Sequence, residues 1–396
     1  MNDRNRGKPE SCPVGNPVNI GIGNKFQREQ DVLTGSPGGL GFVRYYNSNG
    51  SLSPIAIGAN WILNYAQALF FTTNVITATR KDGKTNRFFP HEGGWKPNLD
   101  VEDTLEEIKD NGGVTTGWRY TTPDNTAELY DTDGVLQSIT DLRGNTQTLT
   151  YNATSGLLER VDTNTGEFLI FGYDAQNRIA SISDHSTLTR VWSYRYDAIG
   201  NLEFVDNPDG TTKQYHYEDI SFPNALTGIT DERGIRYATW AYDVQGRAAL
   251  STHAGNAQRV DITYNDTDGT RTVTNSLSQP SSYATLVLSG VSLVSDVIGP
   301  GCATCGDGDT STQFDAGSNV LSKTDNGITT AYGNYDSKGQ YGYRIEAQGT
   351  AEERRTDYSY DPRFFNKITS ITEPSVFPGN SKVTSYTYDD FGNRLT

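Results

Sequence analysis

Cysteine, methionine and basic side chains are scarce in this chain of 396 residues, which contains three cysteines and one methionine. So few cysteines exclude a disulfide-dense scaffold, and with only four scattered histidines they offer no second ligand pair for a structural zinc site. Lysine and arginine total 33 against 48 aspartates and glutamates, which gives a net charge of −15. Nucleic acid is therefore not expected as a partner, because phosphate binding requires a basic surface.

Long apolar runs are absent as well. No segment approaches the roughly 20 consecutive apolar residues that a membrane-spanning helix needs, so no membrane span is expected. Hydrophobic residues make up 34% of the chain and the mean hydropathy is −0.60, which is low for a compact globule of this length. A chain of this composition is either disordered or forms an open sheet or shell with a large surface.

The stretch from Ser193 to Asn207 contains the pattern that decides between these two possibilities. Tyr194 and Tyr196 are two residues apart, so on a strand they project from the same face. Asp197–Gly200 then has turn chemistry, since the aspartate caps a turn and the glycine tolerates a positive φ. Leu202 begins a new alternating run. Strand, turn and strand predict a β-hairpin.

This hairpin recurs along the chain. Successive copies of its aromatic residue are 21 to 25 residues apart between Tyr130 and Tyr264, and a second turn, such as Asp231–Gly234, falls half-way through many copies. Two turns per period leave room for two strands, so the sequence predicts an all-β fold almost without helix. We expect the aromatic residues to pack as structural residues on one face of the sheet. The repeated positions are Tyr130, Tyr151, Tyr173, Tyr196, Tyr217, Tyr242, Tyr264, Phe314, Tyr335, Tyr360 and Tyr388.

The chain before the repeats reads as a separate β domain. Strands are expected at Phe42–Tyr46, Trp61–Phe71, Val75–Arg80 and Arg87–Phe89, whereas the acidic residues 98–110 are compatible with either a short helix or a polar strand. We therefore divide the chain into a polar, extended lead-in (1–14), an N-terminal β domain (15–128) and about eleven to twelve repeats (129–396). The copy near residues 286–308 is degenerate.

These repeats resemble the RHS (rearrangement hotspot) or YD-repeat family, whose tandem motif pairs Tyr-Asp with a following glycine and leucine. Residues Gly15–Glu29, Leu40–Ser48 and Gly58–Trp61 are similar to the domain that commonly precedes bacterial RHS repeats. The resemblance implies a long curved or spiral antiparallel sheet of tandem β-hairpins, forming part of a hollow shell and preceded by a β-rich domain. It also implies a secreted or cell-surface bacterial protein, although residues 1–8 lack the apolar stretch of a secretory signal.

The resemblance further implies a non-enzymatic scaffold, the front part of a shell that encloses or delivers a C-terminal toxin cargo not present in this chain. Such a shell is expected to have an interior polar enough to hold unfolded polypeptide. The alternative is a surface or filament protein used in adhesion, with aromatic ladders that stack on glycans. No cofactor, metal or catalytic residue is expected, because no arrangement of a triad, a paired-carboxylate site or a phosphate loop is recognisable.

Two short motifs have alternative interpretations. Cys302 and Cys305 are spaced like a redox or half-zinc motif, but without a second ligand pair a local disulfide or two free thiols is favoured. Asp131–Gly134 and Asp266–Gly269 resemble the start of a calcium loop. The terminal glutamate of such a loop is missing from both, and Asp-Gly is a favoured hairpin turn.

The last strand of the sequence is predicted at Val383–Tyr388, paired with a strand that restarts at Arg394. A strand at a sheet edge carries backbone groups without protein partners and recruits further strands. We therefore expect this chain to self-associate through its C-terminal edge.

Overall fold

The computed structural model describes residues 3–9, 11–34, 39–50, 53, 55–186, 190–300, 308–377 and 379–396. Regular structure in these residues consists of β-strands and two short 3₁₀ turns, η1 (Asp3–Asn5) and η2 (Ala254–Asn256). The all-β fold expected from the repeats is confirmed. No helix in the described part of the chain has the length and apolar character needed to cross a membrane.

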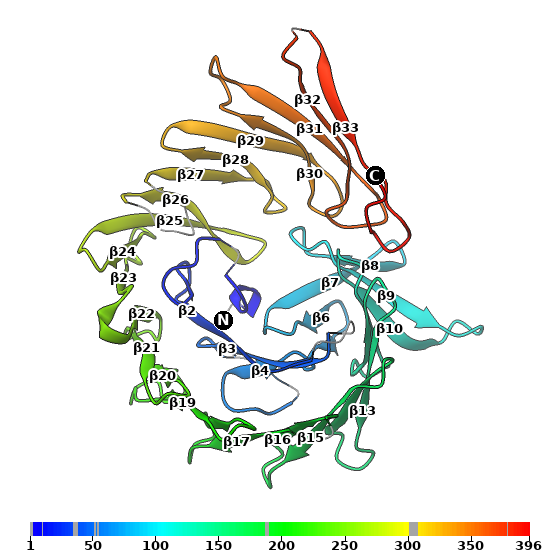
Figure 1. The fold of residues 1–396 in the computed structure, drawn as a ribbon, viewed down its shortest axis with the longest axis vertical. Helices are drawn as coiled ribbons and strands as arrows, with labels where there is room; N and C mark the ends of the chain where they lie inside the picture. The colour runs from blue at the N-terminus through cyan, green and yellow to red at the C-terminus, as the bar shows by residue number, and fades with distance from the viewer. Residues whose placement is uncertain are drawn as a thin grey trace.

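A single antiparallel sheet, β9 to β33, contains all the repeats and rolls into a ring, as Figure 1 shows. Each strand pairs with the next one in the chain, so the sheet is a continuous meander. Its first half comprises β9 (Thr104–Lys109), β10 (Thr115–Thr121), β11 (Ala127–Tyr130), β12 (Leu136–Thr140), β13 (Thr146–Tyr151), β14 (Leu158–Thr163), β15 (Phe168–Tyr173), β16 (Ile179–Asp184), β17 (Val191–Tyr196), β18 (Leu202–Asp206), β19 (Thr212–His216), β20 (Gly228–Thr230) and β21 (Arg236–Tyr242). Its second half comprises β22 (Ala248–His253), β23 (Val260–Tyr264), β24 (Arg271–Asn275), β25 (Pro280–Leu288), β26 (Val291–Ile298), β27 (Thr310–Phe314), β28 (Val320–Asp325), β29 (Ile328–Tyr335), β30 (Tyr341–Glu346), β31 (Arg354–Tyr360), β32 (Ile368–Pro374) and β33 (Ser381–Ser385).

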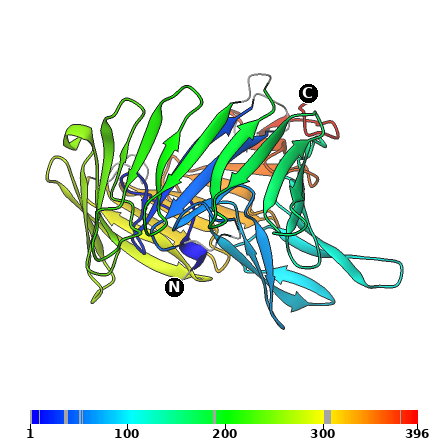
Figure 2. The same cartoon turned by 90° about the horizontal axis from the view of Figure 1, so that it is seen from below.

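Residues 11–97 form an inner domain that lies inside the roll (Figures 1 and 2). It has two four-stranded antiparallel sheets. The first contains β1 (Val18–Asn19), β2 (Asn24–Leu33), β3 (Gly41–Asn47) and β4 (Trp61–Leu63), and the second contains β5 (Ala68–Phe71), β6 (Ile76–Thr79), β7 (Thr85–His91) and β8 (Gly94–Pro97).

The core lies between the inner domain and the inner face of the rolled sheet. Phe42 of β3 makes edge contacts with Phe171 and Tyr194 of the wall, with ring centroids 6.0 and 5.8 Å apart. A second apolar cluster joins Val14 and Ile20 to Ile262 and its neighbours on β22–β26. Because both clusters combine the two parts of the chain, the inner domain and the wall share one core.

A β-bulge accompanies most of the repeated aromatic residues. Tyr196 pairs with Leu202 while Arg195 pairs with Phe204, so Glu203 is an extra residue on the second strand. The same register shift occurs at Tyr130, Tyr151, Tyr173, Tyr242, Phe314 and Tyr360. Bulges bend a strand and increase its twist. Because they recur at the same position in successive hairpins, the sheet curves in one direction.

The inner domain differs from its sequence-based description in one strand. The strand expected at Trp61–Phe71 is wrong, because β4 ends at Leu63 and β5 begins at Ala68. Asn64 causes the break: its Oδ1 accepts from the amide of Val43 and its Nδ2 donates to the carbonyl of Gly41. Apolar residues on both sides of Asn64 made the segment look like one strand in the sequence.

The sheet begins before the first Tyr-Asp pair. Strands β9 to β11 already belong to it, although the sequence division placed residues up to 128 in the N-terminal domain. Residues 104–109 form a polar strand, which answers the open question between strand and helix. The lead-in is also structured, since Arg4 is buried and its guanidinium pairs with Asp100 at 2.7 Å.

At the C-terminal end, β33 stops at Ser385, and the chain folds back so that Tyr388 bridges to Arg394. The expected strand is thus shorter than Val383–Tyr388, although its pairing with Arg394 is present as a single bridge. Figure 1 shows this end of the chain returning toward β8 and β10. Arg143 donates to the Asn393 side chain at 3.3 Å, so turns at the two ends of the sheet meet.

Candidate functional surface

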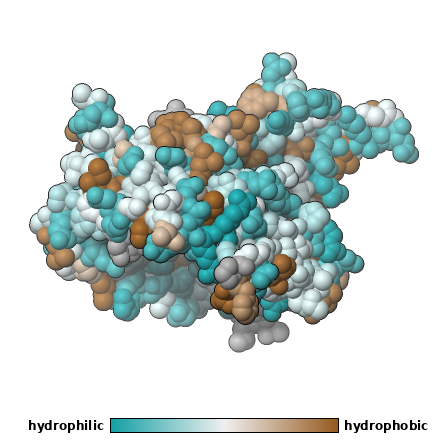
Figure 3. Space-filling model, turned by 90° about the horizontal axis from the view of Figure 1, so that it is seen from above, coloured by the Kyte–Doolittle hydropathy of each residue, from teal (hydrophilic) through white to brown (hydrophobic). Residues whose placement is uncertain are grey.

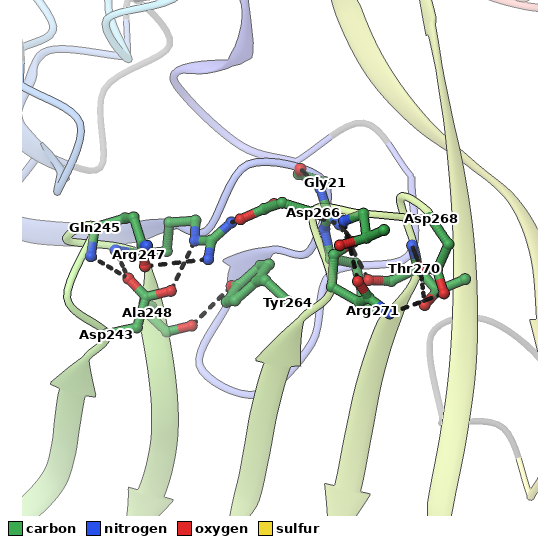
Figure 4. A network of polar contacts seen from close by, with 12 residues as sticks. Gly21, Asp243, Gln245, Arg247, Ala248, Tyr264, Asp266, Asp268, Thr270 and Arg271 are labelled. Carbon is green, nitrogen blue, oxygen red and sulfur yellow. Dashed lines mark hydrogen bonds and ion pairs between the residues drawn. The ribbon is translucent and has the colours of Figure 1, made fainter.

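Most tyrosines of the repeats tie their hairpin to the one before it, whereas the Tyr130 hydroxyl donates to Glu128 and the Tyr217 hydroxyl accepts from the indole of Trp61. The hydroxyl of Tyr196 donates to the carbonyl of Ile179, the first residue of β16, at 2.5 Å. Tyr264 donates in the same way to Ala248, the first residue of β22, at 2.7 Å (Figure 4). The same bond to the preceding hairpin is made by Tyr151, Tyr173, Tyr242, Tyr335, Tyr360 and Tyr388. These residues are therefore structural ties, and Phe314 is a repeat position that lacks the hydroxyl.

The aspartate after each tyrosine organises the turn. Oδ1 of Asp243 accepts from the backbone amides of Gln245 and Arg247, both at 2.9 Å, and its Oδ2 accepts from the Arg247 guanidinium. Figure 4 shows Arg247 extending from this turn to Asp266 in the next one. Asp131 accepts two backbone amides in the same manner. The Asp131–Gly134 motif that resembled a calcium loop is thus a capped turn, and in the Asp266–Gly269 motif Asp268 accepts from the amide of Thr270.

Glycines of the inner domain fit against the bulged ends of the wall hairpins. A Cβ on Gly58 would lie 2.7 Å from the amide nitrogen of Leu202, and one on Gly23 would lie 2.3 Å from the Cβ of Arg247. Backbone hydrogen bonds accompany these close approaches: Ala59 donates to Gly200, and Ala248 donates to Gly23. The glycine-rich N-terminal signature is therefore a docking sequence for the wall.

Three cations of the inner domain lie over aromatic rings of the wall. Arg44 lies 5.3 Å from the centroid of Tyr215, Lys25 lies 4.1 Å from Trp240, and Arg80 lies 3.9 Å from Tyr120.

Two of these cations also pair with carboxylates. Arg44 binds Asp31 at 2.6 Å, and Arg80 binds Glu128 at 2.6 Å. Burial raises the pKa of Tyr46 to about 12, which keeps this inner-domain hydroxyl protonated as it donates to Asn224 of the wall. The interface thus combines buried ion pairs with cation–π contacts.

The lining of the inner face changes where the inner domain ends. In the second strand of the covered hairpins, the fourth residue is Val161 in β14, Ile182 in β16 and Val205 in β18. All three are fully buried beneath the inner domain. The equivalent positions in β28 and β30 are Lys323 and Arg344, with about a third of each side chain exposed. The expected polar interior is wrong for β11–β26, where the face is an apolar core, and describes β27–β33 only in part, because the equivalent position in β32 is Ile371.

A cavity of about 760 Å³ lies where the uncovered part begins. Residues 100–103, which link the inner domain to β9, form one side, and β26–β30 form the other. Its lining includes Phe314, Tyr332, Tyr335, Tyr341, Glu102 and Asp103. A Cβ on Gly339 would lie 2.6 Å from Oε1 of Glu102, so this glycine leaves room for the carboxylate.

Comparisons with known proteins identify the repeat. A model described as RHS Repeat matches residues 173–212, which run from the last residue of β15 to the first residue of β19 and include β16, β17 and β18. The chain contains RHS repeats. A domain of unknown function, DUF6531, matches residues 15–88 of the inner domain. A search of curated proteins found no match.

Solved structures similar to this RHS chain include the crystal structure of TcdB2-TccC3-Cdc42, with a TM-score of 0.45 and 13% identity over 88% of this chain. TcdB2-TccC3 without its hypervariable C-terminal region has the same score and identity over 93% of this chain. The Photorhabdus luminescens Tc holotoxin pore with the TccC3-D651A mutation has a TM-score of 0.40 and 12% identity over 90% of this chain. The chain spans 22 to 23% of the length of these three structures.

The remaining predicted sites fall outside the RHS inner face or outside the described residues. Cys302 and Cys305 lie outside the described residues, so their pairing stays a prediction. Within the described residues, no group of three or more His, Cys, Asp and Glu side chains is arranged to hold a metal ion. Figure 3 shows one rim of the molecule, which is mostly hydrophilic or neutral with apolar patches in between.

Sequence reasoning missed the cations and the glycines through which the inner domain docks. Arg44 and Lys25 have no repeat of their own, and their positions relative to the wall depend on contacts with residues more than 150 positions away, such as Tyr215. Only the glycine-rich run from Gly15 to Gly23 was a usable signal, because closely spaced glycines mark places where backbones approach each other.

Proposed function

We propose that this RHS chain is a structural wall, without catalytic activity, that encloses a polypeptide cargo supplied by the longer protein or by its gene neighbourhood. The observation that carries the proposal is the inner face of β27–β33. This part of the wall continues the surface that binds the inner domain, yet its side chains are only partly buried. A partly covered concave face is suited to hold a second polypeptide.

The chemistry of this uncovered face supports a containing role. Lys323 pairs with Asp325 at 2.9 Å, and Arg344 pairs with Glu346 at 3.1 Å. Because these charges are balanced within the wall, the face is polar without a strong field of either sign. Such a surface contacts polypeptide of varied sequence without binding one ligand tightly.

The contacts of the repeat aromatics support a structural role over the adhesive alternative. The hydroxyls of eight of the eleven repeat aromatics form ties between hairpins. Tyr194 and Tyr215, each two residues before a repeat tyrosine, lie 3% and 1% exposed beneath the inner domain. Rings in these positions are not presented to a glycan on the outside of the roll.

Protease protection tests the proposal. The polypeptide encoded in the same reading frame or directly downstream would be produced together with this chain and digested with a non-specific protease. We expect the enclosed polypeptide to be cleaved at least about tenfold more slowly in the complex than alone, because cleavage requires the enclosed segment to become exposed. Equal cleavage rates, or failure of the two polypeptides to copurify, would overturn the proposal.

A further inference from the structure

We propose that the 760 Å³ cavity between residues 100–103 and β26–β30 binds an arginine or lysine side chain of an extended polypeptide segment held inside the roll. This inference rests on the proposed function and names the chemistry by which the wall contacts its cargo. The cavity continues the interface that the inner domain already makes with the wall.

The existing interface shows which side chains the inner face accommodates. Along β10–β21, the inner domain places Arg80, Arg44 and Lys25 over wall rings at centroid distances of 3.9 to 5.3 Å. Arg44 and Lys25 are buried and Arg80 is partly buried, and the rings contribute to the compensation for their lost hydration. The wall thus binds cationic side chains through aromatic rings at intervals around the roll.

Bare rings occur where the inner domain no longer reaches. Tyr341 lies at the centre of a cluster with Tyr332, Tyr358 and Tyr335, at centroid distances of 5.1, 5.4 and 6.4 Å. All four rings are half-buried, unlike Tyr215 and Trp240 beneath the inner domain. None of the cation–π contacts among the described residues involves this cluster. It offers the same ring faces as the covered wall, with nothing from the inner domain over them.

The opposite side of the cavity favours a positive charge. Asp100 pairs with Arg4, and Lys323 pairs with Asp325. The remaining charged lining residues are Glu102, Asp103 and Lys84, so the cavity carries one net negative charge at neutral pH. A cation that enters therefore meets carboxylates on one side and ring faces on the other.

An unsatisfied acceptor in the same lining points to a ligand that donates hydrogen bonds. Asn86 is 5% exposed and lines the cavity. Its Nδ2 donates to Asp103 and to the hydroxyl of Tyr120, both at 2.9 Å, whereas its Oδ1 has no partner within the described residues. Buried acceptors normally have a donor, and a guanidinium supplies up to five.

Calorimetric titration with a defined peptide tests the inference. The probe is a blocked seven-residue glycine–serine peptide with one central arginine, added to the 396-residue chain. Its matched control replaces the arginine with citrulline, which has the same shape and no charge. We expect the citrulline peptide to bind about tenfold more weakly, because it loses the cation–π and carboxylate interactions. Equal affinity of the two peptides would overturn the inference.

Variants locate the binding. Glu102→Gln and Tyr341→Leu should each weaken the arginine peptide about three- to tenfold. Glu159→Gln, which changes an exposed carboxylate on β14, should leave the affinity unchanged. Circular dichroism and the thermal midpoint establish that each variant is folded. If all three variants bind equally well, the peptide lies elsewhere and the assignment to this cavity is wrong.

The two proposals fail separately. If the arginine peptide does not bind but the enclosed polypeptide still resists protease, the shell function stands and only the cation site is lost. If the peptide binds as expected but no polypeptide is protected, the cavity is a real site on a chain that does not enclose cargo.

Discussion

At the scale of single residues, most repeat tyrosines combine two roles that a pattern of aromatic residues does not separate. The ring fills space on the inner face, and the hydroxyl donates to a carbonyl of the preceding hairpin; Tyr130 and Tyr217 instead bond to Glu128 and Trp61. Tyr196 illustrates both: its ring lies beneath the Arg178 guanidinium, and its hydroxyl reaches Ile179. Phe314 keeps only the first role, so the chain itself contains a repeat with no such bond.

Tyr196→Phe should therefore lower the free energy of unfolding by about 1 kcal/mol, because it removes one partly buried hydrogen bond and leaves the carbonyl of Ile179 with one partner fewer. Tyr196→Ala should cost more, approaching about 3 kcal/mol, although the half-buried ring keeps it below the range for fully buried aromatic side chains. Urea denaturation measures both changes.

Tyr332→Phe is the matched control for the hydroxyl. The hydroxyl of Tyr332 makes no hydrogen bond within the described residues, so this change should alter stability by less than about 0.5 kcal/mol. Equal losses from Tyr196→Phe and Tyr332→Phe would show that the hydroxyl tie contributes nothing.

At the scale of elements, the aspartate turns give the sheet a defined pH dependence. The hydrogen bond from Arg233 lowers the pKa of Asp231, and the hydrogen bond from Asn393 lowers the pKa of Asp389. A carboxylate whose pKa is lower in the folded state stabilises the fold above its unfolded pKa, near 3.9, and this stability is lost as the pH falls through the folded pKa.

We therefore expect the thermal midpoint to be level near neutral pH and to fall below about pH 4. Asp231→Asn should lower the thermal midpoint at neutral pH and make its fall below about pH 4 shallower. Burial raises the pKa of Glu102 and of Asp103, so these two groups contribute in the opposite sense. A midpoint that rises as the pH falls from neutral toward about 4 would mean that such groups outweigh the turns.

Docking of the inner domain depends on glycines at the hairpin ends, and Gly58→Ala should disrupt it. The added Cβ would lie 2.7 Å from the amide nitrogen of Leu202, so the two backbones must separate. Gly166 has a similar positive φ, 94° against 100°, but nothing within 4 Å of an added Cβ. We expect Gly58→Ala to cost about 1–3 kcal/mol more than Gly166→Ala in chemical denaturation. Equal losses of stability from the two substitutions would mean that the cost comes from the positive φ alone and not from the contact with Leu202.

The sequence predicted those elements whose signals are local and repeated. Tyr194, Tyr196 and Gly200 specify strand and turn within a few residues, so the hairpins and the all-β fold were predicted, whereas the bulge at Tyr196 was not. The break at Asn64 was missed because its cause is a pair of hydrogen bonds to β3, about 20 residues earlier. The sequence also did not predict that the inner domain covers the inner face, because a contact such as that of Arg44 with Tyr215 joins residues far apart in the chain and leaves no local pattern.

At the scale of the whole molecule, the C-terminal edge remains the place where other strands are expected to pair. The amide of Tyr386 donates to Thr369, so by alternation the amide of Ser385 points away from β32. The tail covers only part of this edge, since Leu395 donates to Thr387.

This 396-residue chain should therefore self-associate, and Ser385→Pro, which removes an outward amide, should reduce the association. Light scattering over a dilution series measures it. A monomer at every concentration would show that the edge does not recruit strands.

The hydroxyl ties connect each hairpin only to its predecessor, which makes the wall a row of nearest-neighbour couplings. The inner domain cross-links the row from β9 to β26, whereas the later hairpins are held by their neighbours and by isolated contacts such as those of Arg143 with Asn393 and Asn125 with Arg363. Fraying should then be directional, starting at β32 and β33 and running backward until it meets the first cross-linked hairpin. In hydrogen exchange, amides of β28–β32 should lose protection well before those of β13–β22. A sheet that unfolds from one edge always opens at that edge, so a polypeptide held inside it would be released there.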